Sequence, residues 1–447
     1  MGKVHLLTGT KETTTEYNLV RVNSAWTRKE KHSHTASTES VSPAMIYESL
    51  TDTGTCWTVV TPIIFSYKVI ETHALLDPCN STLLTGHTQG PQQADNMRIP
   101  KKPMKRFVVV DQEVYQIYGP EINKYFEANN VNFKILALPT TEENKSMEMA
   151  LKILEELNSF SIDRRTEPVI AIGGGVCLDI VGLAASLYRR RTPYIRVPTT
   201  LLSYIDASVG AKTGVNFANC KNKLGAYIPP VATYLDLSFI KSVPRRHISN
   251  GMAEMLKMAL MKHKELFELL EKHGQHLLES KFQSDSEVFG PCSQSVFRST
   301  RLAIVTMLEE LAPNLWEDDL NRLVDFGHLI SPALEMRLLP ALLHGEVVNI
   351  EMAYMVYVSW ESGLVTEEEK NRIIGCMVGL ELPVWHQACT MDMIQSSLQE
   401  RLKHSGGLIR MPLPVGLGKA EIFNNTSTDV LISAHEKWSN ELSTHAV

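Results

Sequence analysis

The sequence contains three candidate ligands for a catalytic zinc ion: Glu254, His328 and His344. Glu254 has Asn250 four residues before it and Lys257 three after it, and helical spacing places these three on one face. His328 and His344 each lie beside a glycine in otherwise apolar sequence, which distinguishes them among 15 histidines that spacing alone does not separate. One carboxylate and two imidazoles leave a coordination position open for water or a substrate oxygen.

The stretch from Pro198 to Asn222 sets charged side chains among glycines and other small residues. This stretch contains Asp206, Lys212 and Lys221. Burying such charges is costly unless a ligand or an opposite charge compensates them. The alternative is a surface loop with solvated lysines. We favour ligand binding, because the glycines allow close backbone approach to a bound molecule.

A glycine triplet, 173–175, follows the apolar strand predicted over 169–172. A helix is predicted from Val176 to Tyr188, with Asp179 in its first turn. Free backbone N–H groups and the helix dipole at such a corner favour a bound phosphate. The triplet alone is weak evidence, since it is not the GxGxxG fingerprint of dinucleotide-binding proteins.

These residues belong to a predicted alternation of strands and helices. Strands are expected over 57–69, 106–110, 133–138, 169–172 and 194–197, and helices over 119–129, 146–160 and 176–188. Such alternation predicts a parallel sheet with its ligand at the carboxyl ends of the strands. Asp111, the turn 139–145 and the glycine triplet all fall at those ends.

The second half of the chain is predicted to be helical. Helices are expected over 249–278, 294–311, 320–335, 347–362 and 367–378, with polar loops over 77–104 and about 280–294. We therefore predict three parts: a disordered or loosely attached leader (1–54), an α/β domain (55–245) and a helical domain (246–447).

Composition excludes several classes of protein. A net charge of -6 gives no electrostatic footprint for nucleic acid or an anionic membrane, and no apolar run reaches membrane-spanning length. Seven scattered cysteines make neither a disulfide framework nor a thiolate zinc site. Without a signal-peptide core at the N-terminus, a cytoplasmic protein is expected.

Seven motifs together resemble the sugar phosphate cyclase superfamily, the relatives of 3-dehydroquinate synthase, over residues 57–420. They are GGGVCLDIVG, RVPTTLL, DASVGAKTGVN, KNKLGAY, NGMAEMLK, GHLISPALE and LLHGEVV. The resemblance implies an N-terminal NAD-binding α/β domain with a parallel sheet, an all-α C-terminal metal domain, a site in the cleft between them, and a homodimer.

The resemblance also implies roles for individual residues. NAD+ is expected on Asp111, Glu143, Lys145, Gly174, Gly175, Val176, Asp179, Thr199, Thr200, Lys221 and Asn250. A divalent metal, Zn2+ or alternatively Co2+, is expected on Glu254, His328 and His344. The sugar phosphate is expected on Arg190, Asp206, Lys212, Asn222, Lys257, Asp325 and either Lys403 or His404.

Departures from the 3-dehydroquinate synthase pattern point to one branch of the superfamily. Pro332 replaces the second histidine of the GHTFGH motif, and Asp325 replaces an asparagine. Asp325, His404 and the run from Lys212 to Asn216 resemble 2-epi-5-epi-valiolone synthases, not the sister desmethyl-4-deoxygadusol synthases. Leu329 differs from the family's GHT and removes a hydroxyl beside the predicted ligand.

The implied reaction cyclises sedoheptulose 7-phosphate with loss of phosphate and regenerates NAD+ in each turnover. A polyol dehydrogenase of the glycerol dehydrogenase type is the rival from another reaction class, but it needs no basic residues for a neutral substrate. A non-catalytic binding protein that kept the fold is a third possibility, which metal analysis distinguishes.

Overall fold

The computed structural model describes residues 17–22, 24–30, 44–51, 54–88, 104–283 and 291–445. The chain divides into two compact units, Met1–Phe65 and Ser66–Val447. In the first unit, strand β1 (Tyr17–Val22) pairs antiparallel with β2 (Ala25–Glu30), and β3 (Met45–Thr51) with β4 (Gly54–Val60). The predicted leader therefore contains strands, and its remaining residues lie outside those described. The predicted division at residue 245 stays a prediction.

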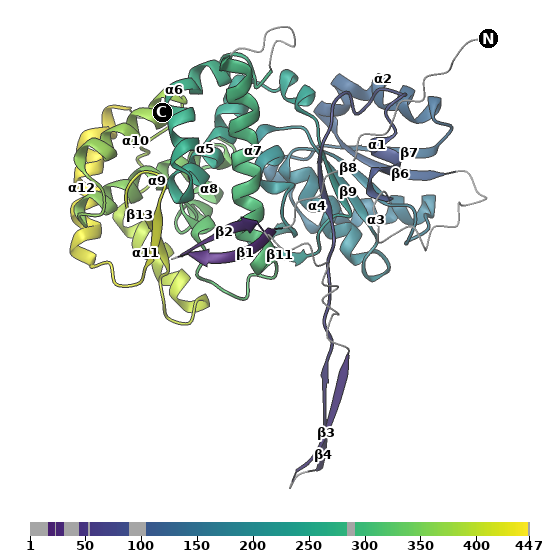
Figure 1. Cartoon of the computed structure of the whole chain (residues 1–447), viewed down its shortest axis with the longest axis horizontal. Coiled ribbons are helices and arrows are strands. Elements are labelled where there is room, and N and C mark those ends of the chain that lie inside the picture. Colours follow the sequence, from purple (N-terminus) through teal and green to yellow (C-terminus); the bar gives the residue numbers. More distant parts are fainter. Residues whose placement is uncertain are drawn as a thin grey trace. The chain divides into compact units, whose positions relative to one another are not determined.

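The second unit contains a six-stranded, wholly parallel sheet (Figure 1). Its order is β5 (Lys68–Glu71), β12 (Ala232–Leu235), β9 (Tyr194–Pro198), β8 (Val169–Gly173), β6 (Lys105–Asp111) and β7 (Asn132–Leu138). The predicted α/β fold with a parallel sheet is confirmed. The strand expected over 57–69 is wrong as one element, because β4 ends at Val60 and β5 begins at Lys68. Pro62 between them cannot donate a ladder hydrogen bond.

Helices cover both faces of this sheet. Helices α3 (Met147–Phe160) and α4 (Gly175–Leu187) pack on one face, and α1 (Thr82–Thr85) and α2 (Gln112–Ala128) on the other. Short turns join these elements: η1 (Gly86–Thr88), η2 (Glu142–Asn144), η3 (Tyr188–Arg190) and η5 (Leu237–Ser242). Of the predicted loop 77–104, residues 89–103 lie outside those described. This three-layer arrangement leaves the carboxyl ends of the strands for a ligand.

Two details of the predicted helices are wrong. Helix α2 begins at Gln112, seven residues before the expected start at Gly119, because the Asp111 carboxylate accepts from the amides of Glu113 and Val114 and caps it. Helix α4 begins at Gly175, so Asp179 lies in its second turn.

The stretch after β9 folds into a π-helical turn, η4 (Ser203–Ala207), and an antiparallel hairpin. The hairpin consists of β10 (Lys212–Phe217) and β11 (Cys220–Tyr227). It brings Lys212 and Lys221 onto one rigid element, whereas the sequence left open whether this stretch was a surface loop.

The rest of the second unit is largely helical, as predicted. Its helices are α5 (Arg245–Lys262), α6 (Lys264–Glu279), α7 (Pro291–Leu311), α8 (Ser331–Leu338), α9 (His344–Glu361), α10 (Glu367–Gly379), α11 (Met391–His404) and α12 (Thr428–Leu442). A short hairpin of β13 (Met411–Pro414) and β14 (Ala420–Phe423) and the turns η6 (Ala312–Asn314), η7 (Leu323–Asp325) and η8 (Ser443–His445) complete it. Helix α9 is buried on all sides and packs against α5, α8, α10 and α12.

The helix expected over 320–335 is wrong. Only the turn η7 and the start of α8 fall in this range, and the residues between them form a loop. Gly327 adopts a φ of 75° there, a left-handed conformation that interrupts a helix. The helix expected over 249–278 is divided at His263, and residues 284–290 of the predicted polar loop lie outside those described.

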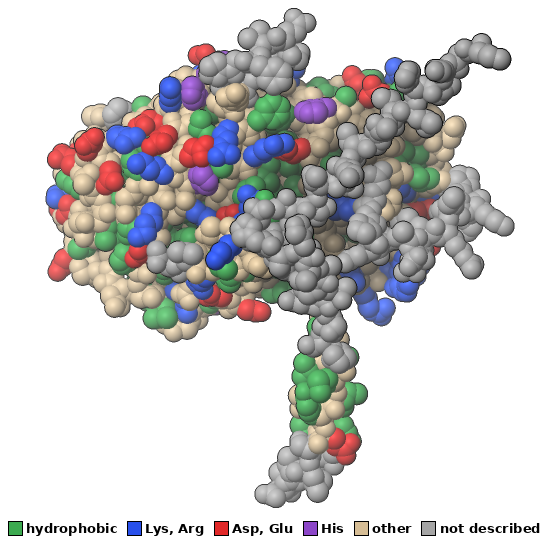
Figure 2. All heavy atoms as spheres, in the orientation of Figure 1, with side chains coloured by type: hydrophobic (Ala, Val, Ile, Leu, Met, Phe, Trp, Pro, Cys, Tyr) green, Lys and Arg blue, Asp and Glu red, His purple; other side chains and the backbone are tan. Residues whose placement is uncertain are grey.

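The surface and the cysteines agree with the composition. On the face that Figure 2 shows, acidic and basic side chains of the described residues are interspersed. The six cysteines whose side chains the structure describes are free thiols. No helix in the described part of the chain has the length and apolarity needed to cross a membrane.

Candidate functional site

Glu254, His328 and His344 come together although they lie on three separate elements. Glu254 is on α5, His328 is in the loop before α8, and His344 is the first residue of α9. One ligand atom from each lies within 4.8 Å of the others, and the Nε2 atoms of His328 and His344 are 3.7 and 3.5 Å from Glu254 Oε1. Glu254 is 1% exposed, and its Oε1 atom, which faces both imidazoles, has no hydrogen-bond partner among the described residues. A buried carboxylate oxygen of this kind, facing two imidazole nitrogens, fits a divalent cation.

Hydrogen bonds orient both imidazoles for metal binding. His328 Nδ1 lies 3.0 Å from the Phe326 carbonyl oxygen, so Nδ1 carries the proton and the lone pair of Nε2 faces Glu254. Burial, with Lys257 nearby, lowers the pKa of His328 to about 3. This imidazole is therefore neutral, the form that ligates a metal.

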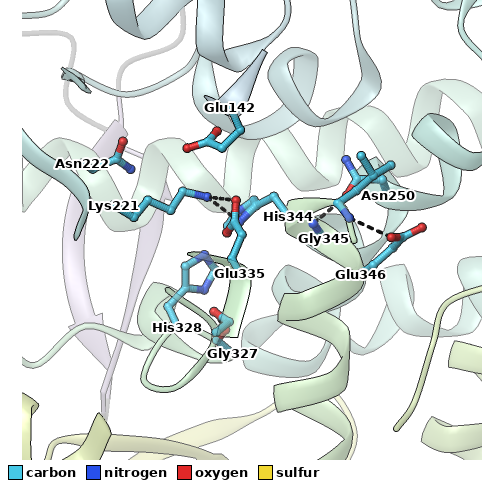
Figure 3. A network of polar contacts seen from close by, with 12 residues as sticks. Glu142, Lys221, Asn222, Asn250, Gly327, His328, Glu335, His344, Gly345 and Glu346 are labelled. Carbon is cyan, nitrogen blue, oxygen red and sulfur yellow. Dashed lines mark hydrogen bonds and ion pairs between the residues drawn. The ribbon is translucent and has the colours of Figure 1, made fainter. Parts of the chain in front are cut away.

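A carboxylate behind His344 was not predicted from the sequence. Glu335 Oε2 lies 2.8 Å from His344 Nδ1, and Lys221 forms an ion pair with Glu335 Oε1 (Figure 3). Burial lowers the pKa of His344, but Glu335 and Glu254 outweigh it and raise that pKa to about 9. A carboxylate, histidine and metal in series fixes the ring and makes it a stronger ligand. The available sign of Glu335 in the sequence was a charged residue at the end of the otherwise largely apolar motif GHLISPALE.

Lys221 lies next to the predicted metal ligand His344, whereas the sequence analysis assigned it to the cofactor. Its Nζ atom is 3.0 Å from His344 Nδ1, besides the ion pair with Glu335. The side chain points toward these two residues in Figure 3. Its predicted contact with NAD+ stays a prediction.

Lys257 is buried between two carboxylates. Its Nζ atom is 2.5 Å from Glu254 Oε2 and 3.1 Å from Asp206 Oδ2. Burial lowers the pKa of Lys257, but Asp206 and Glu254 more than reverse this and raise it above its usual value. Burial and Glu254 raise the pKa of Asp206, which Lys257 opposes. The structure thus places a charged ammonium group directly beside the predicted metal.

Asn250 connects α5 to the start of α9. Its Oδ1 atom accepts from the Gly345 amide at 2.6 Å, next to His344. A methyl group at position 345 would lie 2.0 Å from the Asn250 carbonyl oxygen, so only glycine permits this approach. Asn250 therefore holds the start of α9, which carries the predicted metal ligand His344, and its predicted contact with NAD+ stays a prediction.

The predicted cofactor corner forms at the carboxyl ends of adjacent strands. Strand β8 ends at Gly173, and Gly174 and Gly175 begin α4. Asp111 ends the neighbouring strand β6 and accepts a hydrogen bond from Thr140. The hydroxyl of Thr199 is buried and has no partner among the described residues. Free amides at a helix start and an unpartnered buried hydroxyl fit a phosphate-bearing cofactor.

Three other predicted cofactor residues surround this corner. Thr200 shares a hydrogen bond with Ser203 at 2.8 Å, and a methyl group at Gly174 would meet the Thr200 side chain at 3.3 Å. Val176 is half-buried in the first turn of α4, and Glu143 is exposed in η2. All lie near the strand ends, and their contacts to NAD+ stay predictions.

Lys145, Asp179 and Asn222 form one polar cluster. Lys145 is 4% exposed and donates to Asp179 Oδ2 and Asn222 Oδ1, both at 2.6 Å. Burial lowers the pKa of Lys145, but Asp179 and Glu142 reverse this and raise it. The cluster joins α4 to β11, so it links the glycine corner to the hairpin that carries Lys221.

Lys212 and Asp325 belong to a second charged network. Lys212 and Arg322 both form ion pairs with Glu317. Asp325 pairs with Arg322 at 2.5 Å and with Arg401 at 2.6 Å. Burial raises the pKa of Asp325, but the two arginines more than offset this and lower it. Lys212 remains 55% exposed, so its ammonium group is accessible to a solvent-borne anion.

Three predicted substrate residues lie apart from the metal cluster within this chain. Arg190 is exposed at the end of α4 opposite to the glycine corner. Lys403 and His404 are exposed at the end of α11 and pair with Glu400 of the same helix at 2.7 and 3.1 Å. Their predicted roles stay predictions.

Arg196 is a buried side chain whose contacts were not predicted from the sequence. This side chain on β9 is fully buried, and it donates to the carbonyl oxygens of Ala207 (3.1 Å), Gly210 (2.6 Å) and Lys212 (2.7 Å). It therefore fixes the segment between Asp206 and Lys212. An arginine inside a predicted buried strand was the available signal.

Comparisons with known proteins agree with this arrangement. The family model for the N-terminal part of 3-dehydroquinate synthase matches residues 135–250, and the model for its C-terminal part matches residues 251–404. A 2-epi-5-epi-valiolone synthase from an Actinomyces species is 45% identical over 381 residues, which are 85% of this chain and 97% of that protein. A demethyl-4-deoxygadusol synthase from Trichormus variabilis is 35% identical over 73% of this chain and 79% of its own.

A solved structure is similar over the same region. The 2-epi-5-epi-valiolone synthase of Streptomyces hygroscopicus subsp. jinggangensis, with NAD+ and Zn2+ bound, has a TM-score of 0.77 and 41% identity. The match covers 86% of this chain and 100% of that one.

Proposed function

Because this chain belongs to the 3-dehydroquinate synthase family, we propose that it is a 2-epi-5-epi-valiolone synthase. Its substrate is sedoheptulose 7-phosphate, which it cyclises with loss of inorganic phosphate. The observation that carries the proposal is the convergence of Glu254, His328 and His344, whose ligand atoms lie within 4.8 Å of one another. Among family members, 45% identity over 97% of a valiolone synthase supports this product over that of the demethyl-4-deoxygadusol synthase, which is 35% identical.

The cofactors follow from the two parts of the site. Glu254, His328 and His344 hold Zn2+, with Co2+ as an alternative, and the glycine corner with Asp111 and Asp179 holds NAD+. When bound, these groups supply reversible hydride transfer and polarisation of a substrate oxygen. The relative with NAD+ and Zn2+ bound supports this assignment.

The side chains of the chain itself hold and orient the sugar phosphate. Lys257 stays protonated between Asp206 and Glu254, so it stabilises negative charge on a substrate oxygen beside the metal. Lys212 supplies an accessible ammonium group for the phosphate. When substrate binds, an ion pair with the phosphate replaces the ion pair between Lys212 and Glu317. The phosphate leaves with its bridging oxygen, and the hydride removed from the sugar returns to it, so no net oxidation occurs.

Loss of phosphate by elimination makes the enzyme a carbon–oxygen lyase. We expect a homodimer in the cytoplasm, and the free thiols of the six cysteines whose side chains are described agree with a reducing compartment. Arg190, Asn222, Asp325 and His404 complete the expected set of substrate residues.

The test is to incubate the purified protein with sedoheptulose 7-phosphate, NAD+ and Zn2+. We expect one inorganic phosphate per substrate, no accumulation of NADH, and a product with the mass and stereochemistry of 2-epi-5-epi-valiolone. NADH accumulation without phosphate release would identify a polyol dehydrogenase instead. A demethyl-4-deoxygadusol product would keep the family and refute the assignment within it.

A further inference from the structure

Glu351 is a fully buried carboxylate on the helix that begins with a metal ligand. It lies seven residues after His344 on α9, which places both side chains on one face two helical turns apart. Glu351 Oε1 accepts from the Leu329 amide at 2.8 Å. Its Oε2 accepts from the amides of Ile330 (2.8 Å) and Ser331 (2.5 Å).

These amides belong to the three residues that directly follow His328. They precede or begin α8, whose own N-cap, Ile330, has no side-chain oxygen. A local serine, threonine or aspartate would normally supply this cap. Here the cap comes from α9, so one carboxylate joins the loop of His328 to the helix of His344.

Two further contacts make the loop around His328 rigid. The Ser331 hydroxyl donates to the Gly327 carbonyl oxygen at 2.6 Å and closes the loop on either side of the histidine. Gly327 packs so closely on α9 that a methyl group there would lie 2.7 Å from Met352. Three backbone amides donate to the Glu351 carboxylate, and no lysine, arginine or histidine of the described residues pairs with it.

We propose that Glu351 is a positioning residue that fixes His328 relative to His344 and thereby sets the affinity of the metal site. Burying a carboxylate without a cation is costly, and three amide donors offset that cost only while the loop keeps this conformation. The inference rests on the proposed function, because it takes the cluster of Glu254, His328 and His344 as the metal site.

Glu351→Gln tests the proposal. It keeps the shape of the side chain but replaces one accepting oxygen with an NH2 group, a donor that then faces a backbone amide.

Glu361→Gln is the matched control. It makes the same change on the same helix, where Glu361 instead accepts from Ser433 and Lys437. The zinc Kd is measured by competition with a chromogenic chelator. Hydrogen exchange of a peptide covering 327–334 is measured by mass spectrometry on the zinc-free protein.

We expect the zinc Kd of Glu351→Gln to rise about tenfold or more, as for other residues behind metal ligands. Exchange at 329–331 should also become at least about tenfold faster, while Glu361→Gln matches the wild type in both measurements. Unchanged values for Glu351→Gln would overturn the proposal. If the wild type binds no zinc, the proposed function fails, and the exchange measurement still decides whether Glu351 holds the loop.

A milder variant covers the case in which Glu351→Gln does not fold. Ser331→Ala removes the hydroxyl that closes the loop, and Ser359→Ala removes a buried hydroxyl elsewhere on α9 that has no partner among the described residues. We expect a zinc Kd raised about threefold or more for Ser331→Ala alone. Equal effects of the two substitutions would also contradict the proposal.

Discussion

Lys257→Met is expected to destabilise the zinc-free protein more than the zinc-bound protein. Lys257 is 3% exposed and lies 2.5 Å from the buried Glu254 and 3.1 Å from the partly buried Asp206, so its removal takes the ammonium partner from both carboxylates. Breaking a buried ion pair in this way costs about 3–5 kcal/mol. Bound zinc neutralises Glu254, and only Asp206, which is 22% exposed, then stays unpaired. We therefore expect the cost with zinc to fall to about 1–2 kcal/mol.

The same difference must appear in zinc affinity, because binding and folding are linked. A difference of about 2 kcal/mol corresponds to zinc binding about 30-fold more tightly to Lys257→Met than to the wild type. Turnover should nevertheless be lost, since the variant lacks the ammonium group beside the substrate oxygen.

Urea unfolding of chelator-treated and zinc-saturated protein measures both costs, and competition with a chelator measures the affinity. Lys262→Met is the matched control. Lys262 is on the same helix, is 9% exposed, and pairs with Glu309 (2.8 Å) and Glu310 (3.0 Å), away from the metal ligands. Its loss should cost the same with and without zinc. Equal costs for Lys257→Met in the two forms, or an unchanged zinc Kd, would refute the reasoning.

Three further substitutions test other parts of the account. Lys212→Ala should abolish phosphate release while leaving the Kd of NAD+ unchanged in calorimetry, and retained turnover would remove Lys212 from the site. Burial, with Arg106 and Lys68, lowers the pKa of His87 to about 4, so the unfolded chain takes up a proton below pH 6.5 that the folded protein does not. Because of His87, the free energy of unfolding falls by about 2 kcal/mol between pH 7 and pH 5. In urea titrations, the decrease over this range should be about 2 kcal/mol smaller for His87→Gln than for the wild type. Arg196→Met removes the guanidinium donor from three carbonyl oxygens and should cost at least about 2 kcal/mol by urea unfolding. A smaller cost would show that water replaces the guanidinium.

Much of the sheet and the metal cluster could be predicted from local sequence. Apolar strands bounded by Asp111 and by the glycine triplet identified β6 and β8, because burial of a parallel strand is visible in its composition. Glu254, His328 and His344 followed from residue type and local setting, and the structure brings their ligand atoms within 4.8 Å.

Features that depend on contacts between distant elements could not be predicted. Glu335 and Lys221 meet across 114 residues of sequence, and no local pattern indicates that pairing. The loop that carries His328 was taken for helix, because its amides are capped by Glu351, a residue 20 to 22 positions later. Charged residues in apolar motifs were the only local sign of either arrangement.

Anomalous diffraction at the zinc edge, on crystals of the zinc-loaded protein, locates the bound ion. We expect one strong peak at bonding distance from a Glu254 oxygen and from Nε2 of both His328 and His344. A peak at other residues, or none at this cluster with zinc in excess, would contradict the proposed metal site.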